Sequence, residues 1–273
     1  MNKPPNQSTG PGVAGWLLHE DRHIIVVNKP AGLATQAPPG IASLEAWVKE
    51  YLKQRYNKPG RVYLGVPQRL DRPVSGVLVL ARQSKAAQRL HAQFQQRSVL
   101  KEYWAVVEGR VEPARGNWTD WLRKVTGQAR VEPAEPQGHG ARYAETTYEV
   151  LRWAEGVTLL ALRPRTGRMH QLRAQAAWRG YPILGDQLYG SRQPLPRPLP
   201  SADEPAEAIA LHACSLTFRH PLHGDFGQLC TFTAPLPPYW PLHPEATAEP
   251  APVVAGGSVD ASSSTVWPNL EGS

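Results

Sequence analysis

The chain has 273 residues, of which 41% are apolar, so it is long enough for one large globular domain or two small ones with a hydrophobic core. Its two cysteines, Cys214 and Cys230, are too few for a disulfide framework or a four-ligand zinc site. No apolar segment approaches the ~20 residues of a membrane-spanning helix, and residues 1–15 lack the apolar run of a signal peptide. We therefore expect a protein of the reducing cytoplasm with no membrane segment.

Positive charge is concentrated in the first 235 residues. The formal net charge of the whole chain is +7, and that of residues 1–235 is four units higher, +11. The difference arises because residues 236–273 contain no Lys or Arg but four acids, which are Glu245, Glu249, Asp260 and Glu271. A basic globular body suits a polyanionic partner such as nucleic acid, but it is equally typical of an ordinary basic protein.

Composition also predicts the domain boundaries. We expect residues 16–237 to form one continuous domain, because no internal repeat or linker interrupts them. Residues 1–15 are rich in Pro, Gly and Asn, and residues 238–273 are acidic and rich in Pro, Ala and Ser, so both ends are expected to be disordered. The proline-rich residues 193–205 are expected to form a surface loop within the domain.

In chain order, the first predicted element is a β-strand over Ile24–Val27, a β-branched run followed by the turn composition of residues 28–32. An amphipathic helix capped by Ser43 comes next. Its apolar face repeats with helical spacing and consists of Leu44, Trp47, Val48, Tyr51 and Leu52. A buried strand is then predicted over Val77–Leu80.

A second helix is predicted to begin with Ser84 as its cap. Its expected buried face consists of Ala87, Leu90, His91 and Phe94, whereas Arg89 and Arg97 are expected to face solvent.

Three more strands are predicted over Tyr103–Val107, Thr147–Leu151 and Thr158–Leu162. A helix over His170–Arg179 is expected to end at Gly180, which adopts the left-handed conformation at low cost. Strands outnumber helices and often follow one another directly. The predicted fold class is therefore α+β, with a mixed, largely antiparallel sheet and peripheral helices.

Residues 68–82 are the most informative segment for function. A single acid, Asp71, lies between Arg69 and Arg72 and shortly precedes a predicted buried strand. Neighbouring cations favour the ionised form of a carboxylate, which suits chemistry on an anionic substrate. From these residues alone, an ordinary surface ion pair that contributes little to stability is the favoured interpretation.

This segment resembles H-R-L-D-x-x-T-S-G-L-L-L-x-A-K, the signature of the RluA-type pseudouridine synthases. Three later segments resemble further motifs of this family, in the same order. They are residues 101–103 (K-x-Y), 166–173 (T-G-R-x-H-Q-I-R) and 180–186 (G-x-P-I-x-G-D). Weaker similarity at residues 27–33 and 211–213 extends the resemblance to about residues 17–235.

The resemblance implies a pseudouridine synthase catalytic domain that lacks the N-terminal RNA-binding module of its relatives. Such an enzyme breaks the bond from ribose to N1, turns the base and remakes the bond at carbon 5, so we expect no cofactor and no metal. Asp71 is expected to be the catalytic residue, as nucleophile or proton acceptor. Arg173 is expected to grip Asp71 in bidentate fashion, and Tyr103 to stack on the target base and relay a proton.

The resemblance also implies RNA contacts, in which Arg69 helps to hold the RNA open around a flipped nucleotide. The other expected substrate contacts are Arg72, Arg168, His170, Gln171 and Leu172. His170 could also be interpreted as a metal ligand, but no second His or Cys lies at i+3 or i+4 from it. A hydrogen-bonded structural role is therefore favoured over metal binding, as it is for His212. Gly76, Gly167 and Gly185 are expected at backbone turns.

Two positions depart from the family pattern. Gln68 replaces the usual histidine, and Val74 replaces a threonine. Glutamine keeps a hydrogen-bonding group and valine keeps the β-branched shape, so we expect activity to be retained with an altered substrate preference.

Together these features predict a monomeric cytoplasmic enzyme that isomerises uridines in structured RNA, with ribosomal RNA favoured over transfer RNA. A non-catalytic RNA-binding or assembly factor on the same fold is the alternative. It would be marked by loss of Asp71, Tyr103 or Arg173, all of which are present. A nucleoside hydrolase is a third hypothesis, but such enzymes generally need two cooperating carboxylates, and no second acid lies near Asp71 in the sequence.

Overall fold

The computed structural model describes residues 13–195, 207–222 and 227–244. Its strands are β1 (Leu17–Glu20), β2 (Ile24–Lys29), β3 (Ser75–Ala81), β4 (Leu100–Glu108), β5 (Arg115–Lys124), β6 (Val131–Pro133), β7 (Arg142–Ala154), β8 (Val157–Pro164), β9 (Leu211–Arg219) and β10 (Leu229–Thr233). Its helices are α1 (Leu44–Arg55), α2 (Ser84–Gln95) and α3 (Gln171–Trp178), with short 3-10 helices η1 (Val13–Trp16) and η2 (Gln187–Tyr189).

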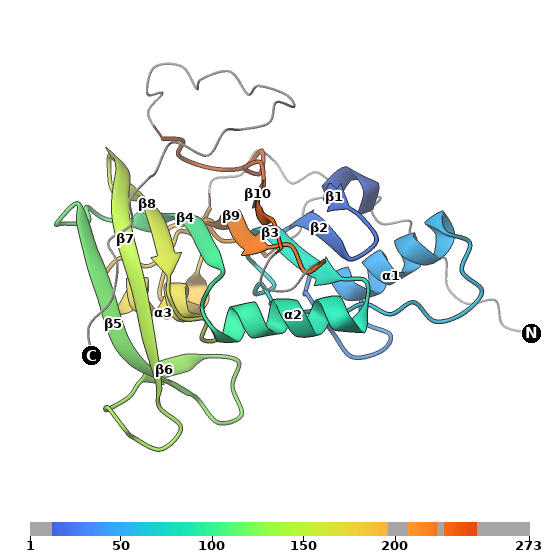
Figure 1. Cartoon of the computed structure of the whole chain (residues 1–273). Coiled ribbons are helices and arrows are strands. Elements are labelled where there is room, and N and C mark those ends of the chain that lie inside the picture. The colour runs from blue at the N-terminus through green and yellow to red at the C-terminus, as the bar shows by residue number, and fades with distance from the viewer. Residues whose placement is uncertain (1–12, 196–206, 223–226, 245–273) are drawn as a thin grey trace, which may run out of the picture.

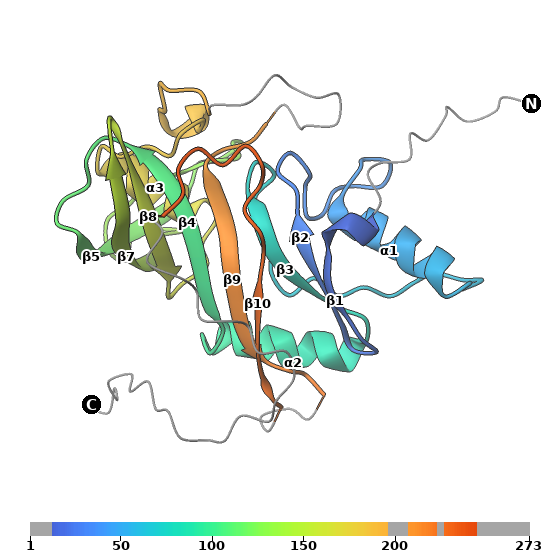
Figure 2. The ribbon, with the colours of Figure 1, turned by 90° about the horizontal axis from the view of Figure 1, so that it is seen from above.

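The strands form one sheet in the order β1-β2-β3-β9-β4-β8-β7-β5-β6, with β10 paired to β9. Among the described strands only β3 and β9 pair in parallel, through Ser75–Gly76 and His212–Ala213, and the other pairs are antiparallel. Figures 1 and 2 show β1, β2 and α1 at one end of the molecule and β5 to β7 at the other. The predicted α+β class with a mixed, largely antiparallel sheet is confirmed.

The predicted helices and strands lie where the sequence patterns place them. The expected strands are parts of β2, β3, β4, β7 and β8, and the expected helices are α1, α2 and α3. Ser43 caps α1 by accepting a hydrogen bond from the Ala46 backbone N–H at 3.2 Å. Gly180 follows α3 with φ +83°, as expected. The patterns do not predict β1, β5, β6, β9 and β10, because strands such as β5 carry mostly polar residues and form by pairing with a neighbour.

Two details of α2 correct the prediction. Ser84 is the first helical residue rather than the cap; Gln83 holds the cap position, and its side chain makes no capping hydrogen bond. The helix buries Ala86 and Leu90 against the sheet, whereas His91 is exposed. Ala87 and Phe94 of the expected face are partly buried against the same core, so the expected face is wrong only at His91, and Ala86 is buried in addition. Figure 1 shows α2 beside the sheet.

The core of the sheet lies around β3, all seven residues of which are buried. Gly76 has φ +121°, and a Cβ atom there would lie 2.3 Å from the carbonyl oxygen of Ala213. Gly76 is therefore required where β3 and β9 approach each other closely, not at a turn as expected. By contrast, Gly185 lies outside the strands with φ +82°, a conformation that favours glycine.

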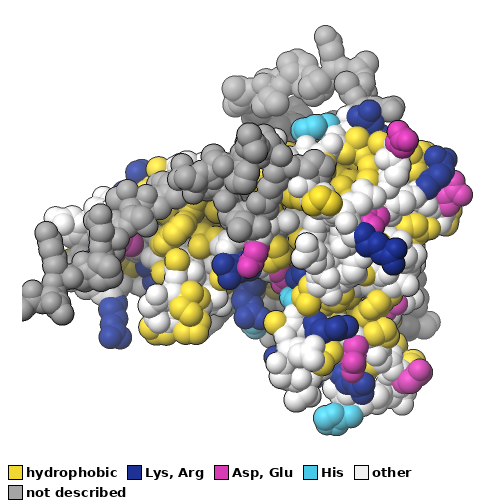
Figure 3. Space-filling model, turned by 180° about the vertical axis from the view of Figure 1, so that it is seen from behind, with side chains coloured by type: hydrophobic (Ala, Val, Ile, Leu, Met, Phe, Trp, Pro, Cys, Tyr) yellow, Lys and Arg dark blue, Asp and Glu magenta, His cyan; other side chains and the backbone are white. Residues whose placement is uncertain are grey.

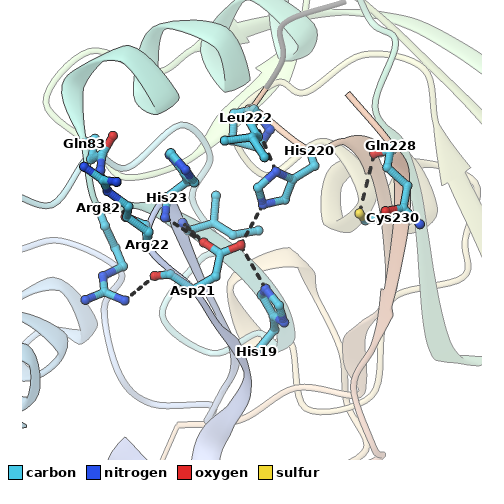
Figure 4. Close-up of polar contacts among 12 residues, drawn as sticks. His19, Asp21, Arg22, His23, Arg82, Gln83, His220, Leu222, Gln228 and Cys230 are labelled. Atoms are coloured by element: carbon cyan, nitrogen blue, oxygen red, sulfur yellow. Dashed lines mark hydrogen bonds and ion pairs between the residues drawn. The ribbon is translucent and has the colours of Figure 1, made fainter. Parts of the chain in front are cut away.

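The carboxylate of Asp21 forms a group of hydrogen bonds between the β1–β2 turn and the end of β9 (Figure 4). Asp21 accepts hydrogen bonds from the backbone N–H groups of His23 and Ile24, at 2.6 and 2.8 Å. Its other oxygen lies 3.3 Å from Nε2 of His19 and 2.8 Å from Nε2 of His220. Burial alone would raise the pKa of Asp21, but these hydrogen bonds lower it to about 2. Asp21 thereby ties the β1–β2 turn to the chain that follows β9.

The packed part of the chain extends beyond the expected domain boundaries. Val13 precedes residue 16 and is buried, and Tyr239 and Trp240 follow residue 237 and are also buried in the core. The expected boundaries therefore need correcting at both ends. Residues 1–12, residues 245–273 and most of the expected loop at residues 193–205 lie outside the described residues.

His212 is a fully buried residue that links β9 to the start of β3. Its Nε2 lies 3.3 Å from the carbonyl oxygen of Ala234, which can only accept, so Nε2 carries the ring proton. Nδ1 then accepts from Oγ of Ser75 at 2.8 Å. Burial lowers the pKa of His212 to about 4, although the hydrogen bond to Ala234 opposes this shift. The expected structural role of His212 agrees with these contacts.

This histidine predicts a pH dependence of stability. The unfolded chain binds a proton at His212 near pH 6.5, but the folded chain binds it only near pH 4. The contribution of His212 to the free energy of unfolding is therefore fully present above about pH 6.5. It decreases as the pH falls towards 4, by about 3 kcal/mol in total. Urea unfolding at several pH values should show the loss in the wild type and a shallower dependence in His212→Asn. Parallel curves for the two proteins would contradict the prediction.

Candidate active site

Asp71 lies in the loop that enters β3, and a neighbouring loop fixes its position. The hydroxyl of Thr35 donates to the carbonyl oxygen of Leu70 at 2.8 Å and accepts from the Leu70 backbone N–H at 3.1 Å. On the other side of Asp71, the carbonyl oxygen of Arg72 accepts from the backbone N–H of Gly32 at 2.7 Å. The backbone of the reactive loop is thus held on both sides of Asp71 by residues 32–35.

A buried lysine connects the same two loops. Lys29 is fully buried, and its ammonium nitrogen donates to the carbonyl oxygens of Pro30, Leu33 and Arg72 at 2.8, 2.7 and 3.3 Å. Burial lowers the pKa of Lys29 to about 7, and the negative charge of Asp71 opposes this shift. Lys29 lies in the segment at residues 27–33 that shows only weak similarity to the family, and the sequence assigns it no role.

Asp71 faces a cavity of about 920 Å³. The described residues that line the cavity include one carboxylate, that of Asp71, and seven basic side chains. These basic residues are Arg69, Arg72, Arg97, Lys101, Arg165, Arg168 and Arg173. The cavity is formed by the loop at 66–74, the end of α2, the start of β4 and residues 164–173. All nine site residues predicted from the sequence line it. In Figure 3, basic side chains are spread over the face drawn, and several gather near its centre.

Arg173 contacts Asp71, but not in the expected bidentate arrangement. Its Nη1 lies 3.3 Å from Oδ2 of Asp71. The bidentate pair is formed with Asp186 instead, where Nε and Nη2 donate to the two carboxylate oxygens at 2.7 and 2.8 Å. The side chains of Arg173 and Asp186 are only 6% and 1% exposed, whereas that of Asp71 is 30% exposed. Asp186 therefore anchors the guanidinium, and Asp71 stays accessible from the cavity.

His170 is the second polar neighbour of Asp71, and Tyr189 determines its tautomer. The Tyr189 hydroxyl accepts from the backbone N–H of Val131 at 3.0 Å, so its own proton is available to Nδ1 of His170 at 2.9 Å. The ring proton is then on Nε2, which lies 3.6 Å from Oδ2 of Asp71. Burial lowers the pKa of His170, although the charge of Asp71 acts in the opposite direction. A neutral imidazole therefore presents an N–H group to Asp71.

Tyr103 faces the cavity from β4, where it pairs with Leu162 of β8 and Ala213 of β9. Burial raises the pKa of the Tyr103 phenol, and the negative charge of Asp71 raises it further. The phenol is therefore neutral at physiological pH. Its ring and hydroxyl group are available to a planar ligand that enters the cavity beside Asp71.

The remaining predicted residues differ in how much they can offer to a ligand. The side-chain amide of Gln171 is buried and already bonded to its own chain: Oε1 accepts at 2.7 and 3.0 Å, and Nε2 donates at 3.1 and 2.9 Å. Gln171 lines the cavity, and these hydrogen bonds use its side-chain amide within the loop before α3. Leu172 is also buried.

Both arginines beside Asp71 are exposed. Arg72 bonds the carbonyl oxygen of Gly32 at 2.9 Å and lies 3.3 Å from a carboxylate oxygen of Glu207. Asp71 forms its described ion pairs with Arg173 and His170, so the adjacent arginines do not serve as its charge partners.

The comparisons with known proteins agree with this geometry. The family model described as RNA pseudouridylate synthase matches residues 23–178. The chain belongs to this family. The dual-specificity RNA pseudouridine synthase RluA of Escherichia coli strain K12 is 35% identical to this synthase over 228 residues, which are 81% of this chain and 93% of that protein. The ribosomal large subunit pseudouridine synthase C of the same strain is 33% identical over 222 residues, 78% of this chain and 65% of its own length.

Solved structures support the same fold. Human RNA pseudouridylate synthase domain containing 4 superposes with a TM-score of 0.67 at 24% identity, and covers 84% of this synthase and 91% of that chain. Human RNA pseudouridylate synthase domain containing 1 gives a TM-score of 0.61 at 25% identity, covering 81% and 83%. Within the residues that the structure describes, no helix is long and apolar enough to cross a membrane. In the same residues, no group of three or more His, Cys, Asp or Glu is placed to bind a metal ion.

The contact between Tyr189 and His170 leads to a prediction for catalysis by this synthase. In Tyr189→Phe, Nδ1 of His170 loses its hydrogen-bond donor, so the ring no longer keeps its proton on the nitrogen that faces Asp71. We expect kcat to fall about tenfold, as for the loss of one hydrogen bond, with unchanged RNA affinity. Tyr51→Phe, which loses a hydroxyl bonded to Glu20 outside the cavity, is the control. Equal kcat values for both variants would contradict the assigned tautomer.

Proposed function

We propose that this synthase converts particular uridines of structured RNA into pseudouridine, with Asp71 as its catalytic residue. The observation that carries the proposal is the single accessible carboxylate in a cavity whose lining also includes seven Lys and Arg side chains. A cavity with this excess of positive charge attracts a polyanion such as RNA. Its one carboxylate is therefore placed for chemistry on an anionic substrate rather than for binding it.

The geometry suits an isomerisation at a nucleotide taken out of its stack. The Asp71 carboxylate assists cleavage of the bond between ribose carbon 1′ and N1, either by bonding to carbon 1′ or by accepting a proton from the sugar. The freed uracil turns within the cavity, and carbon 5 bonds to carbon 1′. The hydrogen on carbon 5 leaves as a proton and N1 gains one, so no atom or electron is gained overall. Arg173 and the Nε2–H of His170 stabilise the charge of the carboxylate whenever it is free.

Tyr103 is proposed to stack on the uracil and to relay the proton that leaves carbon 5. Stacking of a base on an aromatic ring contributes about 1–3 kcal/mol, which offsets part of the cost of removing the base from its stack. A phenol with a raised pKa stays protonated, so it must pass on its own proton as it accepts the one from carbon 5.

The alternatives receive less support. A non-catalytic RNA-binding protein does not need an accessible carboxylate held by Arg173 and His170 in a basic cavity. A nucleoside hydrolase needs a second working carboxylate, and the nearest candidate is Asp186. Asp186 is 1% exposed and its two oxygens are bonded to Arg173, so it is not available to activate water.

The substrate and the setting are inferred from the relatives and the chain together. One relative is named as a dual-specificity RNA enzyme and another as an enzyme of the large ribosomal subunit, so we propose ribosomal RNA first and transfer RNA second. We also propose that the enzyme acts as a monomer in the cytoplasm. The free thiols of Cys214 and Cys230 are compatible with a reducing compartment.

The first test is release of tritium from RNA labelled at carbon 5 of uridine, with ribosomal and transfer RNA offered separately. We expect release by the wild type and a loss of more than about a thousandfold in Asp71→Asn, which keeps the shape but not the charge. RNA affinity of this variant should be equal or higher, because the cavity loses its only negative charge. Release by Asp71→Asn at the wild-type rate, or none by the wild type from RNA that it binds, would refute the proposal.

Two substitutions at Tyr103 separate stacking from proton transfer. Tyr103→Phe keeps the ring and loses the hydroxyl group, so kcat should fall about a hundredfold while RNA affinity is retained. Tyr103→Ala also removes the stacking surface and should weaken RNA binding by about tenfold or more. Single-turnover tritium release and filter binding measure the two effects. Wild-type kcat in Tyr103→Phe would exclude the phenol from the chemistry.

A further inference from the structure

Three cations on one wall of the cavity have no acidic partner among the described residues. They are Arg97, which follows α2, Lys101 at the start of β4, and Arg168 in the loop before α3. By contrast, Arg163 pairs with Glu102 and Glu149, and Arg165 pairs with Glu145. Positive charge gathered in this way costs free energy in the free protein, and this cost suggests an anionic ligand.

Lys101 is the centre of this group. Its ammonium nitrogen makes one described hydrogen bond, to the carbonyl oxygen of Thr166 at 3.2 Å, and an ammonium can donate three. Burial, together with the positive charge of Arg97, lowers the pKa of Lys101 to about 8. Two donors of a partly desolvated ammonium group therefore remain for a ligand in the cavity.

The two arginines complete the group. Arg168 uses Nε to bond the carbonyl oxygen of Tyr143 at 2.9 Å, which orients its guanidinium. Burial lowers the pKa of Arg168, and the charge of Arg97 adds to the effect. Arg97 is exposed at the end of α2, where it adopts φ +58°. Arg97 is thus close enough to Lys101 and to Arg168 to disfavour the positive charge of each, and a bound anion would relieve this repulsion.

The position of the group relative to Tyr103 indicates which anion it takes. Lys101 and Tyr103 are two residues apart on β4, so their side chains leave the same face of the strand, and their Cα atoms are roughly 7 Å apart. Both line the cavity, whereas Glu102 between them pairs with Arg163. A uridine that stacks on Tyr103 would place the next part of its sugar–phosphate backbone beside Lys101.

We propose that Arg97, Lys101 and Arg168 form a binding site for one backbone phosphate of the RNA, adjacent to the target uridine. This inference rests on the proposed function, which it extends from the reactive base to the backbone that holds it. The site positions the substrate and takes no part in the chemical step. Asp71 and Arg173 pair with each other within the protein, whereas the three cations of the phosphate site have no acidic partner among the described residues. Their counter-charge would come from the bound RNA.

The first experiment measures binding of unfractionated transfer RNA at several salt concentrations. Each phosphate contact contributes about 0.7–0.9 to the slope of log affinity against log salt. The double variant Arg97→Gln with Lys101→Gln should therefore lower the slope by about one and weaken binding at low salt about tenfold. Lys53→Gln, which removes an exposed lysine of α1 outside the cavity, should leave the slope unchanged.

Two readouts exclude a merely structural effect. The double variant should melt no lower than the wild type, because it removes repelling charges, and it should raise KM more than it lowers kcat. A melting temperature well below that of the wild type, or an unchanged salt slope, would overturn the phosphate site. Binding needs no turnover, so this experiment tests the site even if the tritium assay rejects the proposed enzymatic activity.

A second experiment locates the phosphate. Synthetic hairpins that carry the uridine identified by the tritium assay are made with one neutral methylphosphonate linkage at successive positions. The wild type should lose about tenfold in affinity at one linkage next to the target, and the double variant should lose almost nothing there. Equal losses for both proteins at every linkage would show that these residues do not hold that phosphate. Tritium release by the wild type alongside such equal losses would reject this inference and leave the proposed function intact.

Discussion

The site depends on the ion pairs that the buried guanidinium of Arg173 forms with Asp186 and Asp71. Asp186 takes two of its N–H groups in a bidentate pair and leaves a third directed at Asp71. Since Arg173 and Asp186 are almost fully buried, neither can leave the pair without exposing the other as an uncompensated charge. The pair therefore holds the cation rigidly at the bottom of the cavity, and Asp71 keeps part of its surface for a substrate.

The backbone around Asp71 is rigid for a related reason. Buried polar groups at residues 29–35 satisfy the carbonyl and N–H groups on both sides of Asp71, and Lys29 bonds three carbonyl oxygens at once. On the far side of the loop, Gly76 lets β3 come close enough to β9 for parallel pairing. Asp71 thus lies on a loop that is held on both sides by hydrogen bonds within the protein before a ligand arrives, an arrangement of the kind that favours preorganised catalysis.

Electrostatics divides the cavity into two parts with different tasks. Near Asp71, opposite charges and a neutral histidine are balanced within the protein. On the wall formed by Arg97, Lys101 and Arg168, positive charge is left without an acidic partner among the described residues. A polyanionic substrate would neutralise the positive charge of this wall and leave the ion pairs around Asp71 intact. This division explains how one cavity can attract RNA strongly and still present a negatively charged group to it.

The sequence by itself determined the helices and several buried strands, because their signals are local: apolar spacing in α1, a β-branched run in β2, and a glycine after α3. It also predicted nine site residues that all line one cavity in the structure. The tertiary structure decided which group each of these side chains pairs with. Arg173 has two carboxylates within reach, and only packing shows that Asp186 takes the bidentate pair. The tautomer of His170 likewise depends on Tyr189 and Val131, which lie far from it in sequence. Such choices depend on burial and on distances across the fold, which a linear pattern does not contain.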